Sequence, residues 1–181
     1  ISDVRVEPVA GNLTDHYDPR TKTLRLSEDV YGSRSMAAAG VAAHEVGHAI
    51  QHARAYAPLQ FRSAWVPVAN FSSGLSMFII IAAFFLGGAA TPLGKTAAIV
   101  GIVLFSATTV FTLVTLPVEF DASRRALVTL QRGSYMTREE LGGAKKVLDA
   151  AALTYVAAAV SSILMLLYWA FRLGLLGGRR D

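Results

Sequence analysis

The sequence contains no cysteine and comparatively little charge, and each absence narrows what the protein can be. Without cysteine the chain forms no disulfide and offers no thiolate ligand or thiol nucleophile, so any bound metal must be held by His, Asp or Glu. Charged residues make up 17% of the 181 residues, against about 25% in an average soluble protein, while hydrophobic residues make up 53%. This composition argues against a disordered chain and against a freely soluble domain.

The charge that is present is weakly basic, with a formal net charge of +4. We do not interpret it as a sign of a nucleic-acid partner, because the basic residues are scattered and adjoin apolar stretches. Orientation of the chain in a membrane accounts for such residues more simply.

Three long stretches of the chain carry no charged side chain, and each exceeds the about 20 apolar residues that a membrane-spanning helix needs. We therefore predict a mostly α-helical membrane protein with three transmembrane helices, at about Val68–Leu86, Thr96–Leu116 and Ala150–Phe171. Buried helices of a soluble bundle are the alternative, but three such stretches would leave too little polar surface to cover a core in so short a chain.

The predicted spans divide the chain into five parts. These are a polar segment (1–65), a transmembrane hairpin (66–116) that turns at 87–94, a second polar segment (117–149), a third transmembrane helix (150–173) and a basic tail (174–181). Three spans place both polar segments on one side of the membrane, and the two segments hold 13 of the 17 basic residues. The positive-inside rule therefore predicts that both are cytoplasmic, although the basic tail argues mildly for the opposite orientation.

A metal-binding motif lies in the first polar segment, where residues 44–48 read His-Glu-Val-Gly-His. The surrounding Met36–Gln51 is rich in good helix formers, and on a helix His44 and His48 stand one turn apart on the same face. Glu45 lies beside them, where it can accept a proton from water, as in the H-E-x-x-H signature of zinc peptidases. Glycine inside a helix costs about 1 kcal/mol relative to alanine, so we expect the glycine of the motif to permit close packing near the metal.

A third ligand is needed, because catalytic zinc sites use three protein ligands and keep a fourth position for water. His52 lies too far along the same helix, about 12 Å from the first histidine. Glu119 is the favoured candidate, since it follows the second predicted span and shares a helix face with small residues that permit close approach. His16, in a turn-rich stretch, is the lesser alternative. Asp121 points to the opposite side of that helix, and we expect it to form a surface ion pair with the two arginines that follow it.

A short β-hairpin is predicted before the metal helix. Leu13–Tyr17 and Thr23–Leu26 flank Asp18–Arg20, whose Asp-Pro-Arg sequence is typical of a turn. Zincins generally place the substrate backbone along an edge strand beside the metal helix, which is a form of β-augmentation. The hairpin therefore suits a small zincin-like metal-binding region, and simple packing against the helix is an equally good explanation for it.

Three motifs resemble those of the YugP-like bacterial zinc-dependent membrane metallopeptidases: TDHYDPRTKTLRLSEDVY, AAHEVGHAIQHA and LPVEFDASRRAL. The resemblance covers about Val4–Leu173. More distantly, the layout is similar to that of the HtpX-type and CAAX prenyl proteases, which are gluzincins. The resemblance implies one zinc ion per chain, held by His44, His48 and Glu119, with Glu45 as the catalytic base.

One position departs from the gluzincin pattern. Many gluzincins carry an aspartate four residues after the glutamate ligand, where it orients a ligand histidine. Here the corresponding residue is Ser123, whose hydroxyl orients a histidine more weakly than a carboxylate does. The resemblance also implies a membrane helix and a short polar region before Ile1, so we expect the natural protein to have an upstream segment.

The sequence therefore predicts a zinc-dependent endopeptidase embedded in the bacterial cytoplasmic (inner) membrane, with its active site on the cytoplasmic side and peptides or membrane proteins as substrates. Tyr17, His16 and Arg124 are candidates for stabilising the oxyanion of the tetrahedral intermediate. A catalytically silent metal-binding membrane scaffold is the alternative, but a structural site has no use for a base at Glu45. A metal transporter or sensor would need ionisable residues within its spans, and the predicted spans have none.

Overall fold

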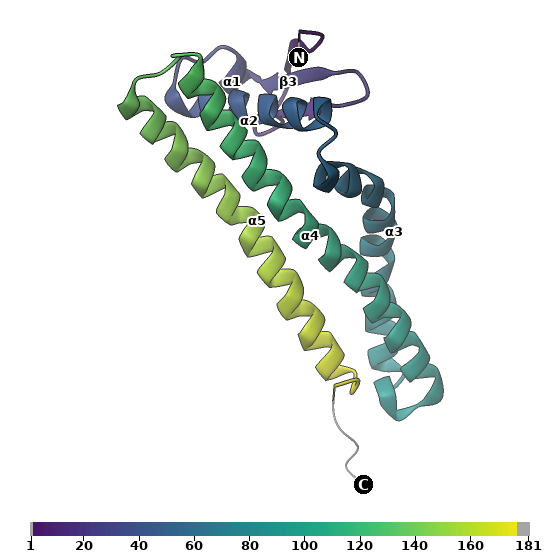
Figure 1. The fold of residues 1–181 in the computed structure, drawn as a ribbon. Coiled ribbons are helices and arrows are strands. Elements are labelled where there is room, and N and C mark those ends of the chain that lie inside the picture. The colour runs from purple at the N-terminus through teal and green to yellow at the C-terminus, as the bar shows by residue number, and fades with distance from the viewer. Residues whose placement is uncertain (1, 177–181) are drawn as a thin grey trace. The chain divides into compact units, whose positions relative to one another are not determined.

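The computed structural model describes residues 2–176 and is mostly helical, with one small sheet (Figure 1). In chain order the elements are β1 (Arg5–Val9), β2 (His16–Asp18), β3 (Thr23–Ser27), α1 (Glu28–Tyr31), α2 (Met36–Ala53), α3 (Ala57–Phe85), the 3-10 helix η1 (Gly88–Ala90), α4 (Pro92–Arg132) and α5 (Arg138–Arg172). The predicted mostly helical fold class is thereby confirmed. Residues 177–181 of the predicted basic tail lie outside the described residues.

The chain divides into two compact units. The sheet unit consists of Ile1–Gln60 and Leu116–Tyr155, and the span unit consists of Phe61–Thr115 and Val156–Asp181. The division falls within α3, α4 and α5, each of which contributes residues to both units.

The sheet contains three strands in the order β1-β3-β2. β2 and β3 form the predicted antiparallel hairpin, in which Tyr17 is opposite Leu24, although the first strand is shorter than predicted. β1 pairs with β3 in parallel and was not predicted. The central strand β3 is almost wholly buried, while the edge strand β1 tolerates Pro8 because an edge strand has one unpaired side.

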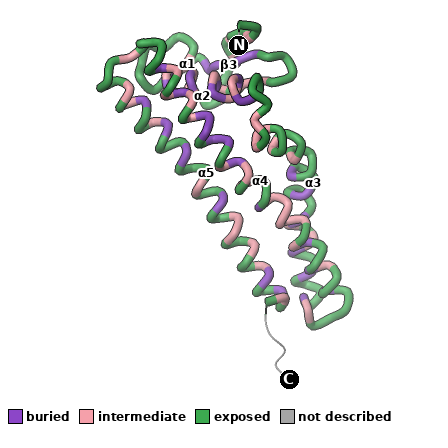
Figure 2. Tube along the Cα trace, viewed as in Figure 1, coloured by how far each residue is buried: buried purple, intermediate pink, exposed green. Residues whose placement is uncertain are grey.

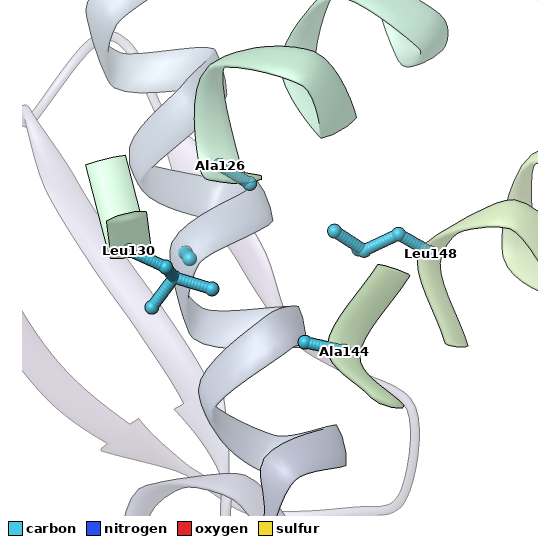
Figure 3. Packing of buried hydrophobic residues seen from close by; sticks show 5 residues of the cluster. Ala126, Leu130, Ala144 and Leu148 are labelled. Carbon is cyan, nitrogen blue, oxygen red and sulfur yellow. The ribbon is translucent and has the colours of Figure 1, made fainter. Parts of the chain in front are cut away.

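α2 begins at Met36 as predicted and ends two residues later than predicted, at Ala53. The side chain of Ser35 caps it by accepting a hydrogen bond from the backbone N–H of Ala38 at 3.1 Å. Small residues then let other helices approach α2 closely. Figure 3 shows part of this core, which consists of Ala43, Ala126, Leu130, Ala144 and Leu148 from α2, α4 and α5.

The three predicted spans are confirmed by α3, α4 and α5, which are the described helices that are long and apolar enough to cross a membrane. The mean hydropathy of their most apolar windows is 1.9, 2.3 and 2.1. Between α3 and α4 the chain reverses at Gly87, whose φ of 87° lies in the left-handed region that favours glycine. Thr91 then caps α4, since its hydroxyl accepts a hydrogen bond from the N–H of Gly94 at 3.0 Å.

All three helices extend well beyond the predicted spans, and α3 begins at Ala57, eleven residues before the predicted first span. α4 continues without interruption through Pro117 to Arg132, and α5 begins at Arg138, before the predicted third span. The segment 117–149 was predicted as a separate polar part, but it is mainly the polar continuation of these two helices. The sequence there is rich in Ala, Leu, Arg, Lys and Glu, which are good helix formers, so the change in polarity does not end either helix.

Large apolar side chains are exposed along the span unit, as the extent of exposed residues on α3 and α5 in Figure 2 illustrates. Phe78, Phe85 and Phe171 are among them. Its buried core is small and consists of Ile80, Ala83, Ala98 and Leu173. Such an arrangement suits a lipid surrounding, in which exposed apolar side chains carry no penalty.

Candidate metal centre

Three of the predicted site residues converge in the sheet unit. His44 and His48 of α2 and Glu119 of α4 each offer one ligand atom, and these atoms all lie within 4.8 Å of one another. Oε2 of Glu119 is 3.1 Å from Nε2 of His44 and 3.6 Å from Nε2 of His48. Two histidines one turn apart and a glutamate 71 residues further along the chain therefore point at a common position.

The two distances from Glu119 to the histidines fit a zinc ion. Zn–N and Zn–O bonds of about 2.0–2.2 Å at tetrahedral angles place neighbouring ligand atoms about 3.3 Å apart. The two distances to Glu119 lie on either side of this value. The donor set of two imidazoles and one carboxylate is one that catalytic zinc sites use, and it leaves a fourth position for water.

Close contact between α2 and α4 creates this geometry. His44 is paired with Ser123, His48 with Glu119 and Gln51 with Val118, so the contacts run in opposite directions along the two helices. Gly47 lies at the closest approach, where a Cβ atom would overlap the backbone carbonyl of Ala122. The motif glycine was predicted to permit close packing, and its contact with the backbone of Ala122 confirms this.

Both ligand histidines have a hydrogen-bond partner on the ring nitrogen that faces away from Glu119. Nδ1 of His44 lies 3.1 Å from the hydroxyl of Ser123. Nδ1 of His48 lies 3.0 Å from Oε1 of Gln51, which is fully buried. Such partners orient ligand histidines and tune their basicity. Gln51 was missed in the sequence, because its role depends on contacts with a distant helix.

Asp121 differs from its predicted surface position. Its ion pairs with Arg124 and Arg125 are present, but its side chain is only 4% exposed and also accepts a hydrogen bond from Nε2 of Gln51 at 3.0 Å. Burial alone would raise the pKa of Asp121, but the hydrogen bonds from Arg125, Gln51 and Arg124 outweigh it and hold the pKa below its usual range. The expectation of a solvent-exposed ion pair was wrong, since α2 covers this side of α4.

Glu45, the predicted base, is buried beside the histidines. Burial raises the pKa of its carboxyl, and the charges of His48 and His44 offset this rise only in part. The backbone of Tyr17 in β2 also lowers this pKa, but by less than burial raises it. A carboxylate with a raised pKa is better able to accept a proton near neutral pH than an ordinary exposed glutamate.

The electrostatics of the ligands favour a cation. Burial alone would raise the pKa of Glu119, but hydrogen bonds from His44 and His48 outweigh it and lower the pKa far below its usual range. Burial alone would lower the pKa of His48, but the hydrogen bond to Glu119 and the charges of Glu119 and Glu45 raise it. The three side chains thus present a buried negative charge that a protonated histidine, or a metal ion in its place, would neutralise.

The other candidates from the sequence lie elsewhere. His16 of β2 is exposed and its Nδ1 lies 2.7 Å from the backbone oxygen of Thr14, so it is not part of the ligand group. His52, excluded on distance, is also outside that group, and its Nδ1 lies 2.9 Å from the hydroxyl of Tyr17. Arg124 is largely exposed and paired with Asp121.

Comparison with known proteins agrees with this geometry. The family described as "putative neutral zinc metallopeptidase" matches residues 1–174. The chain belongs to this family. The "putative membrane protease YugP" of Bacillus subtilis is 49% identical over 165 residues, which cover 91% of this chain and 71% of that relative. No solved structure matches the chain.

Membership of the zinc metallopeptidase family confirms the resemblance found in the three sequence motifs. It supports zinc as the metal and a peptide as the substrate, and the relative and the three apolar helices support a membrane protein. Within the described residues, the group of His44, His48 and Glu119 is the place where the side chains needed for such a metal come together.

Proposed function

We propose that the protein is a membrane-embedded zinc endopeptidase, with one zinc ion held by His44, His48 and Glu119 and with Glu45 as the general base. The observation that carries this proposal is the convergence of the three ligand atoms within 4.8 Å, with a buried carboxylate on the residue next to a ligand histidine. A purely structural metal site would not need that fourth, non-ligand carboxylate.

The metal ligands and Glu45 would have different roles in peptide hydrolysis. A zinc ion at this site would lower the pKa of a water molecule and polarise the scissile carbonyl. Glu45 accepts a proton from the attacking water and returns it to the leaving amine. Its raised pKa suits both steps, because the same group must first take up a proton and then release it.

The sheet provides a place for the substrate backbone. β2 is an edge strand and contacts α2, so one side of it is available next to the metal helix. An extended peptide would add to this edge as a further strand. Tyr17 is favoured among the three oxyanion candidates because its strand β2 contacts α2, whereas His16 and Arg124 are exposed. The hydroxyl of Tyr17 lies 2.9 Å from Nδ1 of His52, so it would have to leave this partner to reach the oxyanion.

We also propose that the site works at the cytoplasmic face of the bacterial inner membrane. The distribution of basic residues supports this orientation, and Glu119 follows the apolar part of α4 by only a few residues. Such a location favours membrane proteins, or chains emerging from the bilayer, as substrates.

Labelling of single cysteines in this cysteine-free chain tests the orientation. Cysteines at Arg54 and Arg132 should react from the cytoplasmic side, and one at the exposed Ala90 should react from the other side. Labelling of Arg54 and Arg132 from opposite sides would contradict both the orientation and the shared metal site.

Metal analysis and peptide cleavage test the activity. The purified protein should contain one zinc ion per chain and cleave casein or a membrane-protein substrate. Glu45→Gln should keep the zinc and lose about 10²–10⁴-fold in turnover, because the amide keeps the shape but cannot accept the proton. The matched control is Glu139→Gln, at an exposed position, which should change neither property. Unchanged turnover in Glu45→Gln would overturn the mechanism, and zinc without any cleavage by the wild type would favour a silent scaffold.

A further inference from the structure

We propose that Gln51 and Asp121 are positioning residues that fix the tautomer of His48 and so keep its Nε2 atom available to the metal. This inference rests on the proposed zinc site, but its main test does not need the metal. It concerns two residues that are not ligands and that lie behind the site, between α2 and α4.

The amide of Gln51 is held in one orientation by its surroundings. Its nitrogen donates to the backbone oxygen of Val118 at 2.8 Å and to Oδ2 of Asp121 at 3.0 Å. A backbone carbonyl and an ionised carboxylate can only accept hydrogen bonds, so both places require the NH₂ end of the amide. Because Gln51 is fully buried, no solvent can replace these partners if the amide turns over.

The orientation of the amide then decides the state of His48. Oε1 of Gln51 lies 3.0 Å from Nδ1 of His48, and an amide oxygen can only accept. Nδ1 must therefore carry a hydrogen, and in the neutral ring the other nitrogen, Nε2, has a free lone pair. Nε2 is the atom that faces Glu119, where the metal would bind.

Asp121 is suited to control this arrangement because its charge is fixed. Arg124 and Arg125 both donate to its carboxylate, and the guanidinium of Arg125 also lies over the ring of Tyr56 at 5.6 Å. The hydrogen bond from Gln51 is therefore charge-assisted, and such bonds are about twice as strong as neutral ones. A fixed negative charge thus determines, through one amide, which ring nitrogen of His48 carries the hydrogen.

The other ligand histidine lacks this control. Nδ1 of His44 faces the hydroxyl of Ser123, which can either donate or accept a hydrogen bond. Ser123 therefore orients the ring of His44 without selecting its tautomer. Before the metal binds, the Glu119 carboxylate lies 3.1 Å from Nε2 of His44 but 3.6 Å from Nε2 of His48. His48 should consequently be the histidine whose hydrogen is already on Nδ1, away from the metal position.

Nitrogen NMR of the zinc-free protein, in mildly alkaline buffer that keeps the imidazoles neutral, tests this directly. In the wild type the hydrogen of His48 should be on Nδ1, and in Gln51→Leu this preference should be lost. Chelator competition should show about 10–100-fold weaker zinc binding by Gln51→Leu, as is typical when a partner of a ligand histidine is removed. The control is Gln131→Leu at an exposed position of α4, which should change neither result.

A pair of substitutions separates polarity from packing. Gln51→Glu places two carboxylates against each other, and Asp121→Asn removes the charge that selects the amide orientation; each should weaken zinc binding by about tenfold or more. In the double variant the hydrogen-bond pairing is restored with the roles exchanged. The amide at residue 121 donates to the carboxylate at residue 51, and that carboxylate still accepts from Nδ1 of His48. If the two substitutions acted independently, their fold losses of zinc affinity would multiply. The double variant should bind zinc at least about tenfold more tightly than this product predicts. Asp149→Asn, which removes an exposed ion pair with Lys145, is the control for the lost charge.

The outcomes distinguish this inference from the proposed function. A hydrogen on Nε2 of His48 in the wild type, or unchanged zinc affinity in Gln51→Leu, would overturn the inference and leave the peptidase proposal intact. Single effects that simply multiply in the double variant would also overturn it, and this comparison remains available if Gln51→Leu fails to fold. A wild type that binds no zinc would overturn the proposed function, while the NMR result would still decide whether His48 has a fixed tautomer.

Discussion

The two units of the molecule differ in how completely their buried polar groups are paired. Within the described residues of the sheet unit, every buried side-chain nitrogen or oxygen has a hydrogen-bond partner, including those of Gln51 and Asp121. In the span unit, the buried hydroxyls of Ser76 and Thr108 and the indole nitrogen of Trp169 have none. Pairing is thus complete for the described buried groups of the sheet unit, while the span unit combines paired groups, such as Thr109 with Ser162, with unpaired ones.

The exposed surfaces differ in the same sense. The span unit exposes many large apolar side chains, as lipid permits, whereas the sheet unit exposes mainly polar and charged ones. The difference indicates that single substitutions in the sheet unit should change zinc binding and the arrangement of the ligand side chains. Single substitutions in the span unit should act on insertion into the membrane. Each prediction below tests one side of this division.

The largest effect should follow from removing a ligand. Glu119→Ala leaves two histidines, so stoichiometric zinc should be lost, and peptidase activity should fall by more than the about 10²–10⁴-fold expected for Glu45→Gln. The protein should still be found in the membrane, because the apolar windows of α3, α4 and α5 are unchanged. Metal analysis of protein extracted from the membrane measures the zinc content and shows that the variant was inserted. A peptide-cleavage assay measures the activity. Full zinc in Glu119→Ala together with loss of zinc in His16→Ala would contradict the ligand assignment.

The features that could be predicted from the sequence are those with a local or strongly constrained signal. The HEVGH motif places two possible zinc ligands and a possible base within about one helical turn. The hairpin has a turn sequence between its strands, and long uncharged stretches indicate membrane spans. Glu119 could be proposed because it is the first carboxylate after the second uncharged stretch and is followed by small residues.

The missed features depend on contacts between distant segments. β1 pairs in parallel with β3, so no turn sequence marks it. Gln51 has an ordinary helical sequence context, and its role arises only because Val118 and Asp121 approach it from α4. The same approach buries Asp121, whose two arginines alone would suggest a solvent-exposed position.

A charge on the exposed apolar surface should have the next largest effect. Phe78 is 75% exposed and lies near the middle of the first predicted span, where an aspartate costs about 3 kcal/mol in membrane insertion. Phe78→Asp should therefore reduce the fraction of protein that resists extraction from the membrane. Leu13 is 96% exposed in the sheet unit, and Leu13→Asp should leave that fraction unchanged. Equal effects of the two substitutions would remove the distinction between the units.

Close packing beneath the metal site should give a smaller but measurable effect. Gly47→Ala forces a Cβ atom against the carbonyl of Ala122, and overpacking of this kind typically costs about 1–3 kcal/mol of stability. It should also weaken zinc binding, because it separates α2 from the helix that carries Glu119. Thermal unfolding and chelator competition measure the two effects.

Two open glycines are the controls for this substitution. At Gly142 of α5 in the sheet unit and Gly74 of α3 in the span unit, an added Cβ atom would meet no other atom within 4 Å. Alanine at either site should be neutral or should stabilise the helix by about 0.5–1 kcal/mol. A Gly47→Ala variant as stable as these two would show that α2 and α4 do not approach as closely as described.

The smallest effect concerns the hairpin that contains the proposed substrate edge. The backbone N–H of Arg20, the hydroxyl of Thr21 and the guanidinium of Arg25 hydrogen-bond to Asp18 and lower its pKa from 3.8 to about 2. Because the folded-state pKa is the lower one, Asp18 contributes stability above about pH 4, and this contribution is lost as the pH falls toward 2. Asp18→Asn should therefore lower the thermal midpoint slightly at neutral pH, and the difference from wild type should shrink between pH 4 and pH 2. The effect is small because Asp18 is near solvent, which screens these interactions. A difference that stays constant over this range would show that the carboxylate charge does not stabilise the turn.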